Sequence, residues 1–456
     1  MLSRRDLFQF AAPALAGSAA GFQGPSAKDR VVLVISVDGF PGWEWQNPRL
    51  PVPNLWKLAQ SGVRAETVKI TNPTVTWPTH TSMITGVRSA RHGVLANGLV
   101  QRNSDSKPVT VKPWHDREDL VQATTIYDLA YDAGLTTAEV DWVAIYNAKR
   151  ITWRFPEVPD PAGKIEREMI EAGLIFELDI KEFFKSSPVW RDQQWTQAGV
   201  HIITKHAPNL LLFHLLNTDA ANHAYGPRTP ASQTAYAFAD ECVAKLLNAL
   251  KTANLWERAT VFIVTDHGFK PITSAVKPNA ILRQMGLVRG SGSAIECDAW
   301  VLPIAGIAGV YFVNPEKKAG LAARLPEVFA KAEGVLRVLA PDEFAAFDLP
   351  HPDRNSRAPD LVLVAKDGYT FNAAHEGDAT GPAPYRGTHG YPASDPDMNG
   401  TFIASGYGIR KGARLDQMSH LDVGPTIGAL LGIEMKNVEG RVLTEILDAS
   451  ALSRRM

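Results

Sequence analysis

Six side chains that could bind metal ions are spread over this 456-residue sequence in four short motifs. They are three carboxylates and three imidazoles, namely Asp38, Asp219, His223, Asp266, His267 and His389. Together they make a ligand set for two zinc ions, each with three protein ligands and open positions for a nucleophile and a substrate. Taken singly, each has an ordinary explanation as a helix cap, a turn former or a structural histidine. The complete set predicts a centre with two Zn2+ ions.

The spacing of these residues supports the same interpretation. Asp219 and His223 are four residues apart, so both side chains face one point if the chain is helical there. Asp266 and His267 are followed by Gly268, which permits a close approach of another backbone segment. His389 lies between glycines in a loop that could bring an imidazole from a distant part of the chain.

A hydroxyl nucleophile is predicted at Thr76, within Asn72-Pro-Thr-Val-Thr-Trp-Pro-Thr-His-Thr-Ser-Met83. Pro78 is typical of the first turn of a helix, which Thr79 to Thr85 would continue. Thr76 would then lie at the positive end of the helix, where an alkoxide and a phosphoryl group are stabilised. The alternative is that one of these threonines only caps the helix. The six metal ligands favour the nucleophile.

Four segments rich in apolar residues predict the buried strands that would position these side chains. The strands are Val31–Val37, Ala138–Val143, Leu210–Leu216 and Ala259–Val264. Three of them are followed by an aspartate, and ligand sites of open α/β sheets lie beyond the carboxyl ends of the strands. Helices are expected over Leu120–Asp132 and after Thr229-Pro230. The alternation predicts an α/β fold with a doubly wound, mostly parallel central sheet and helices on both faces.

The pattern becomes irregular over residues 270–385, which we interpret as a small inserted cap region of a single catalytic domain spanning residues 28–450. Within it, Val310–Val313 and Leu361–Val364 read as strands and Ala319–Ala332 as a helix. Segments 348–359 and 373–384 are rich in proline, glycine, aspartate and histidine, so they are expected to be loops.

The first 24 residues resemble a signal peptide of the twin-arginine type. Arg4 and Arg5 precede an alanine- and glycine-rich stretch that reaches Phe22. The alternatives are an ordinary helix or a membrane anchor, but the stretch is short for a bilayer span and contains Pro13. We therefore expect an exported protein, periplasmic or extracellular, without a stable membrane anchor. Whether the signal is cleaved stays open.

The overall composition excludes some partners. Lysine and arginine total 47 against 48 aspartate and glutamate residues, so no basic excess would attract a nucleic acid polymer. The expected partner is a small-molecule phosphate ester, and the oligomeric state is left open. Cys242 and Cys297 are the two cysteines of the sequence, and they could pair after export or remain isolated thiols.

The motifs occur in an order that resembles the alkaline phosphatase superfamily, and most closely its type I phosphodiesterase/nucleotide pyrophosphatase family. They are Val-Asp-Gly, Thr-Trp-Pro, Thr-Asp-Ala-Ala-Asn-His, Thr-Asp-His-Gly and Gly-Thr-His-Gly. The likeness extends from about residue 30 to 447 and includes Leu421-Asp-Val-Gly-Pro-Thr-Ile-Gly-Ala-Leu-Leu-Gly432. It implies an alkaline-phosphatase-like fold and a metal-dependent phosphodiesterase that acts through a phosphothreonine intermediate.

The resemblance also implies roles for individual residues. One zinc would be held by Asp38, Asp266, His267 and the Thr76 oxygen, and the other by Asp219, His223 and His389. Asn97 matches the family's asparagine that donates a hydrogen bond to a phosphoryl oxygen, although asparagine before glycine is also common in turns. His80, His92 and His420 are interpreted as structural residues that orient their neighbours.

Three departures from the family pattern bear on substrate preference. Thr218 and Asn222 precede ligands where the family has proline and glycine, and Thr79 stands where asparagine is common. A phosphomonoesterase (alkaline phosphatase) or phosphonate hydrolase of the same superfamily would keep every ligand. A sulfatase would need a cysteine or serine at position 76. A non-catalytic metal-binding exported protein is the alternative from another class.

Two further groups of residues concern the substrate. Lys149 and Arg150 could supply the added cation that a phosphate monoester needs, although a solvated basic pair is the simpler interpretation. Trp142, Tyr146 and Trp153 could stack on the second substituent of a diester, although aromatic residues at such spacing commonly belong to a core.

Overall fold

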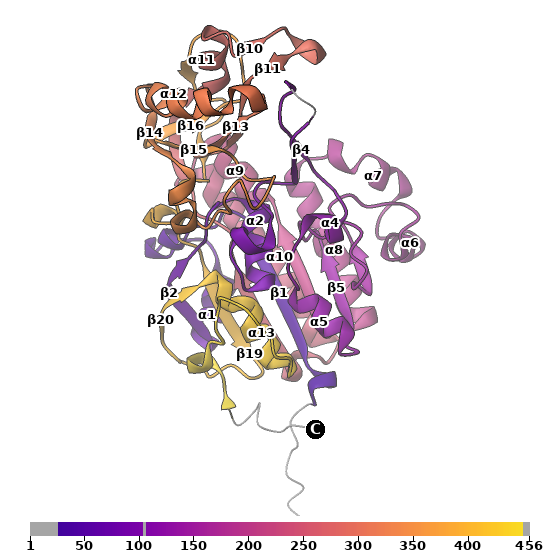
Figure 1. Cartoon of the computed structure of the whole chain (residues 1–456). Helices are drawn as coiled ribbons and strands as arrows, with labels where there is room; N and C mark the ends of the chain where they lie inside the picture. Colours follow the sequence, from indigo (N-terminus) through magenta and orange to yellow (C-terminus); the bar gives the residue numbers. More distant parts are fainter. Residues whose placement is uncertain (1–25, 104–105, 450–456) are drawn as a thin grey trace, which may run out of the picture.

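A central eight-stranded sheet organises the computed structural model, which describes residues 26–103 and 106–449 (Figure 1). In spatial order its strands are β20 (Leu415–Ser419), β2 (Val63–Lys69), β19 (Phe402–Gly406), β8 (Ala259–Val264), β1 (Val31–Val37), β7 (Leu210–Leu215), β5 (Thr137–Val140) and β6 (Trp153–Phe155). The predicted signal peptide, residues 1–24, lies outside the described residues.

Strand β1 lies between β7 and β8 and runs parallel to both of them. Strands β5 and β6 extend the parallel set beyond β7, and β2 pairs in parallel with β20. The exception is β19, which is antiparallel to both β8 and β2. The prediction of a doubly wound, mostly parallel sheet is confirmed.

Both faces of the sheet are covered, as the unbroken apolar strands predicted. Leu33 and Ile35 of β1 pack in one core, whereas Val32 and Val34 pack in the other. The first core contains α1 (Pro53–Ser61), α6 (Lys164–Glu171), α7 (Glu177–Lys181), α8 (Pro188–His206) and α10 (Pro230–Thr252). The second contains α2 (Thr76–Thr85), α5 (Ile126–Asp132) and α13 (Val423–Leu431).

Two predicted boundaries on this part of the chain are wrong. The helix expected over residues 120–132 is split into α4 (Arg117–Leu120) and α5, because Thr125 has an extended backbone and caps α5. The strand expected to reach residue 143 ends at Val140, because Asp141 has a positive φ of 56° that breaks the pleat. Sequence patterns locate elements more reliably than their ends.

Residues 270–388 form smaller sheets with a separate core at the top of Figure 1. An antiparallel sheet has the order β12 (Ala299–Ile304), β13 (Ile307–Phe312), β15 (Leu361–Ala365) and β14 (Val335–Leu339). A second sheet joins β16 (Gly368–Phe371), β9 (Lys270–Val276), β17 (Thr380–Pro382) and β18 (Gly387–Thr388). Helices α11 (Pro278–Gln284) and α12 (Lys318–Ala330) pack on them. Both expected strands and the expected helix of this region are present.

The remaining α-helices and strands are short, and the longest of them is α9, the helix that follows β7. They are α3 (Ser89–His92), β3 (Leu99–Gln101), β4 (Thr110–Lys112), α9 (Asn217–Tyr225), β10 (Val288–Arg289) and β11 (Glu296–Cys297). Cys242 and Cys297 are buried free thiols in two different cores.

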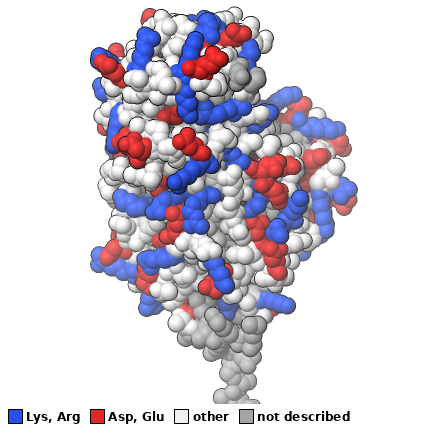
Figure 2. Space-filling view, in the orientation of Figure 1, with Lys and Arg blue, Asp and Glu red and all other residues white. Residues whose placement is uncertain are grey.

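The surface carries charges of both signs close to one another on the face seen in Figure 2. This mixture agrees with the near-equal totals of basic and acidic residues in the sequence. Among the described residues, no helix is both long enough and apolar enough to cross a membrane.

Removing the cap of α5 tests the account of this helix boundary. The Thr125 hydroxyl accepts a hydrogen bond from the Asp128 N–H at 3.2 Å, and the Asp128 carboxylate accepts one from the Thr125 N–H at 3.0 Å. Thr125→Ala is expected to lower the free energy of unfolding by about 1 kcal/mol, measured by urea denaturation. Thr234→Ala is the control, because Thr234 is exposed on α10. Equal stabilities of the two variants would contradict this account.

Candidate active site and metal centre

Three neighbouring strands of the sheet bring the predicted carboxylates together. Asp38 directly follows β1, and Asp266 follows β8 after one intervening threonine. Asp219 belongs to α9, which begins just after β7. Because β8, β1 and β7 are adjacent and parallel, residues far apart in the sequence meet at one edge of the sheet.

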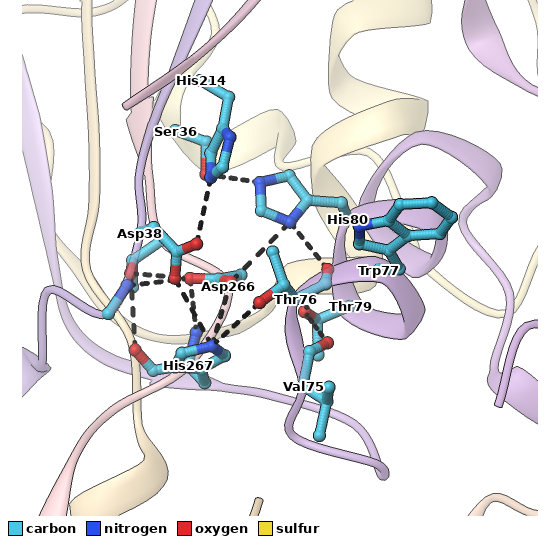
Figure 3. A network of polar contacts seen from close by, with 12 residues as sticks. Ser36, Asp38, Val75, Thr76, Trp77, Thr79, His80, His214, Asp266 and His267 are labelled. Carbon is cyan, nitrogen blue, oxygen red and sulfur yellow. Dashed lines mark hydrogen bonds and ion pairs between the residues drawn. The ribbon is translucent and has the colours of Figure 1, made fainter. Parts of the chain in front are cut away.

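The first group of ligands surrounds the His267 ring (Figure 3). Its Nε2 lies 3.4 Å from Asp38 Oδ1 and 3.1 Å from Asp266 Oδ2. The same nitrogen is 3.5 Å from the Thr76 hydroxyl. The Thr76 hydroxyl, which is the predicted nucleophile, therefore lies directly beside the first predicted set of ligands.

The second group lies next to the first. His223 Nε2 is 3.4 Å from Asp219 Oδ1, because α9 places these residues one turn apart. His389 Nε2 is 3.8 Å from the same oxygen. The rings of His389 and His267 are stacked with centroids 3.6 Å apart, which connects the two groups.

Three carboxylate oxygens at this site are buried without a hydrogen-bond partner. They are Asp38 Oδ1, Asp219 Oδ1 and Asp266 Oδ2. Buried polar atoms are nearly always paired, so three orphaned acceptors in one place need a cation. Burial, together with the charges of Asp266 and Asp219, raises the pKa of Asp38 well above its usual value. This donor set fits divalent metal ions.

The three histidines that are predicted as ligands have the orientation that metal binding requires. Nδ1 of His223 lies 2.8 Å from the Gly387 carbonyl, and Nδ1 of His389 lies 3.0 Å from the Thr74 carbonyl. Nδ1 of His267 is 3.2 Å from the Gly268 carbonyl. A carbonyl only accepts hydrogen bonds, so Nδ1 carries the proton and Nε2 presents its lone pair to the metal.

Possible metal positions follow from these contacts. Asp219, His223 and His389 offer ligand atoms within 4.8 Å of one another, and so do Asp38, Asp219 and His267. Asp219 belongs to both groups, whereas the sequence analysis assigned it to one ion only. Burial and the neighbouring imidazoles lower the pKa of His389 well below its usual value, which keeps this ligand neutral.

Thr76 is the first residue of α2, and its side chain is buried beside the ligands. The predicted helix over residues 79–85 is present and ends at Gly86, whose φ is 67°. Few backbone N–H groups are free at the start of this helix. Pro78 has no N–H group, and the N–H of Trp77 donates to Asn97 Oδ1 at 3.0 Å. The amide group of the exposed Asn97 is thereby fixed with its carbonyl turned to the helix.

Two of the residues that depart from the family pattern connect α9 to the segment that follows β1. Thr218 donates to the carbonyl of Asp38, and Asn222 donates to that of Gly39 at 2.9 Å. The Thr79 hydroxyl donates to the Val75 carbonyl at 2.7 Å, which is a local bond at the start of α2.

A buried histidine that the sequence analysis did not select contacts the site. His214 Nε2 lies 3.1 Å from Asp38 Oδ2, and its Nδ1 lies 2.9 Å from Asp141 Oδ2. His214 therefore holds one oxygen of Asp38 while the other oxygen faces the metal position (Figure 3). The available signal was a lone histidine within the otherwise apolar run Leu210–Leu216.

Of the three other histidines near the motifs, His80 contacts the first group, since its Nδ1 lies 3.8 Å from Asp266 Oδ2, whereas His92 and His420 bond to residues outside both groups. Nδ1 of His80 is 2.7 Å from the Thr76 carbonyl, and its Nε2 is 2.8 Å from the Ser36 hydroxyl. His92 and His420 contact the hydroxyls of Ser82 and Thr71, each at 2.9 Å. Burial lowers the pKa of all three to about 3, so they are neutral.

Comparison with known proteins agrees with this geometry. Residues 32–392 match the model of the family described as type I phosphodiesterase / nucleotide pyrophosphatase. The chain belongs to this family. It is thus a hydrolase of phosphoric ester bonds with an alkaline-phosphatase-like fold.

Two curated relatives are each 25% identical to this chain. The bis(5'-adenosyl)-triphosphatase enpp4 of Xenopus laevis aligns over 88% of this chain and 78% of its own length. Ectonucleotide pyrophosphatase/phosphodiesterase family member 5 of Homo sapiens aligns over 88% of this chain and 74% of its own length. The solved structure of murine ectonucleotide pyrophosphatase/phosphodiesterase 5 superposes with a TM-score of 0.68 at 19% identity. The superposition covers 92% of this chain and 100% of the murine chain, so the two chains share the same fold.

Replacing His214 tests its role in orienting Asp38. His214→Ala is expected to weaken zinc binding by about 10- to 100-fold, because Asp38 loses the partner that fixes its orientation. The dissociation constant is measured by competition with a chelator. His351→Ala is the control, because His351 is half-buried and contacts only Asp353 and its own segment. Unchanged zinc affinity in His214→Ala would contradict this role.

Proposed function

We propose that this protein hydrolyses phosphodiesters, including nucleotide pyrophosphate bonds, with Thr76 as nucleophile at a centre of two zinc ions. The observation that carries the proposal is the trio of unpaired buried carboxylate oxygens next to the Thr76 hydroxyl. Asp38, Asp266, His267 and Thr76 would hold one ion, and Asp219, His223 and His389 the other. When bound, the ions would favour the ionised hydroxyl and withdraw charge from the phosphoryl oxygens.

The residues of the chain then act in two steps. The Thr76 oxygen forms a bond to phosphorus while the bond to the leaving oxygen breaks, and the departing alcohol takes up a proton. Water next attacks the phosphothreonine, which releases the phosphate product and restores the hydroxyl. The direct attack of water on the ester is thereby replaced by two easier displacements at phosphorus. The dipole of α2 stabilises negative charge at its first residue, which is Thr76.

Asn97 contributes hydrogen bonding beside the nucleophile. Its carbonyl oxygen is occupied by the Trp77 N–H, so its amide N–H groups remain available to a phosphoryl oxygen. This arrangement supports the role implied by the family resemblance and agrees with the exposure of Asn97.

A diester is favoured over a monoester by two observations. Arg150 pairs with Asp132 at 2.7 Å and Lys149 is exposed, which is the solvated arrangement and supplies no cation to the site. A cavity of about 340 Å³, lined by residues that include Trp77 and Trp142, offers space for a second substituent. A phosphomonoesterase or phosphonate hydrolase remains the second candidate, because it would use the same ligands.

The names of similar proteins support the substrate class and the location. One relative is a bis(5'-adenosyl)-triphosphatase, and a structural neighbour is an inactive threonine-to-alanine variant in complex with AMP. The prefix of the ectonucleotide pyrophosphatases agrees with export of this chain, for which the sequence predicts a twin-arginine signal at residues 1–24. We therefore infer a periplasmic or extracellular enzyme acting on small phosphate esters.

Replacing Thr76 tests the nucleophile. Thr76→Ala is expected to reduce kcat on bis(p-nitrophenyl) phosphate by about 10³-fold or more, because no hydroxyl remains to attack phosphorus. Zinc content, measured by elemental analysis, should be retained. Thr81→Val is the control, because the buried Thr81 hydroxyl contacts only the Trp77 carbonyl of the same helix. Full activity of Thr76→Ala would overturn the mechanism, and a wild-type protein that binds zinc without any turnover would indicate a non-catalytic metal-binding protein.

Metal removal and a substrate panel test the reaction class. Dialysis against a chelator should abolish hydrolysis, and two equivalents of zinc should restore it, because the ions would favour the ionised Thr76 hydroxyl and withdraw charge from the phosphoryl oxygens. Bis(p-nitrophenyl) phosphate should be hydrolysed faster than p-nitrophenyl phosphate or a phosphonate ester, and a dinucleoside polyphosphate should also be cleaved. A monoester rate far above the diester rate would place the protein with the phosphomonoesterases.

A further inference from the structure

A further group of side chains with the chemistry of metal ligands lies on the helices that cover one face of the sheet. Glu168 belongs to α6, and His201 and His206 belong to the last two turns of α8 (Figure 1). Their ligand atoms lie within 4.8 Å of one another. We call these three residues the Glu168 cluster. None of them belongs to the motifs that form the candidate active site.

The Glu168 cluster and the candidate active site lie at opposite edges of the sheet. His206 is the last residue of α8, and β7 begins soon after it at Leu210. Asp219 follows the other end of β7. Trp153, the first residue of the parallel strand β6, stacks on His206 with ring centroids 3.9 Å apart. The cluster is therefore at the amino-terminal edge of the strands, whereas the predicted metal ligands are at the carboxyl edge.

Both imidazoles of the cluster point to one oxygen of the carboxylate. Nε2 of His201 lies 2.9 Å from Oε2 of Glu168, and Nε2 of His206 lies 2.7 Å from the same oxygen. Zinc binds imidazole nitrogen and carboxylate oxygen at about 2.0–2.2 Å, so the ligand atoms of a tetrahedral site are about 3.3 Å apart. A small outward movement of these side chains would therefore admit an ion.

The surroundings hold the cluster in place and also connect it to solvent. The three side chains are between 9% and 15% exposed, and the Trp153 ring fixes that of His206. His201 also lines a cavity of about 600 Å³ between α8 and α10. Gln197, one helical turn before His201, lines the same cavity, and its Oε1 is buried without a hydrogen-bond partner. An ion could reach His201 through this cavity, and the unpaired oxygen would accept a hydrogen bond from water that accompanies the ion.

A simpler interpretation of the cluster is a set of charge pairs without a metal ion. Lys205 Nζ lies 3.6 Å from Oε2 of Glu168, so an ammonium group already neutralises this carboxylate in part. The Lys205 side chain is 55% exposed, however, and such an exposed pair contributes little to stability. The ammonium group can therefore turn into solvent when a metal ion takes its place. The two interpretations predict opposite effects of removing Lys205.

We propose that Glu168, His201 and His206 bind a transition-metal ion of the zinc type, in addition to any ions of the candidate active site. Two imidazoles and one carboxylate suit zinc and its neighbours in the periodic table, whereas calcium and magnesium prefer oxygen ligands. Each Nε2 gives its lone pair to the ion, while the ring proton is carried by Nδ1. The ion joins α6 to the end of α8, and water completes its coordination. The inference is independent of the proposed function, because the two sites share no residue.

Metal content tests the site by difference. Wild-type protein and the double variant His201→Gln/His206→Gln are equilibrated with micromolar free zinc and compared by elemental analysis. The variant is expected to contain one zinc ion fewer per chain. His115→Gln is the matched control, because His115 also lies beside a carboxylate, 3.5 Å from that of Asp119, and belongs to none of the ligand groups among the described residues. Equal zinc contents of wild type and double variant would overturn the inference, whatever the candidate active site binds.

A variant with tighter binding distinguishes the site from a fold that is merely damaged. Lys205→Met removes the ammonium group that competes for Glu168, so the dissociation constant of the additional zinc should fall about three- to fivefold. The constant is measured by competition with a chelator. Lys251→Met is the control, because Lys251 is exposed near the end of α10 and its replacement changes the net charge equally. Unchanged or weaker zinc binding in Lys205→Met would overturn the inference.

Thermal unfolding tests whether the ion joins the two helices. Excess zinc should raise the Tm of the wild type more than that of His201→Gln/His206→Gln, because the ion binds the folded cluster and stabilises it. Magnesium at the same concentration should shift the Tm of both proteins equally, since it does not favour imidazole ligands. The same zinc-dependent shift in both proteins would contradict the link between α6 and α8.

Discussion

The interaction on which the site depends is the repulsion among three carboxylates that the sheet forces together. Asp38, Asp219 and Asp266 follow three adjacent parallel strands, so the fold itself buries like charges at one edge. Such a cluster is stable only with a compensating positive charge. Divalent metal ions would supply it, and this requirement would connect the stability of the fold to its chemistry.

The surrounding structure fixes the orientation of each ligand. Backbone carbonyls engage Nδ1 of all three ligand histidines, and the Asp141–His214 pair engages the second oxygen of Asp38. Ligands that are held in place before the metal arrives lose little conformational freedom on binding. The same rigidity sets Thr76 beside the metal position at the start of α2. Groups that would otherwise be mobile are therefore held in the arrangement that the proposed mechanism requires.

A separate part of the sheet edge carries a cavity. Strands β5 and β6 carry no predicted metal ligand, but the segments beyond them line the cavity next to Trp77. In the proposed mechanism the metal positions would bind the phosphate, and this cavity would be open to the group attached to it.

The sequence by itself determined the sheet, because unbroken apolar runs predict buried parallel strands. It also predicted that the strand-end aspartates would meet near the three histidines and Thr76 at one edge, where the structure places them. The ends of β5 and α5 were misplaced, because they depend on the backbone of Asp141 and Thr125. Only the tertiary structure revealed that Asp219 lies within 4.8 Å of ligand atoms in both groups, that His214 contacts Asp38 and that Glu166 Oε2 is buried without a hydrogen-bond partner. These are contacts between distant segments, and no local pattern of residues encodes them.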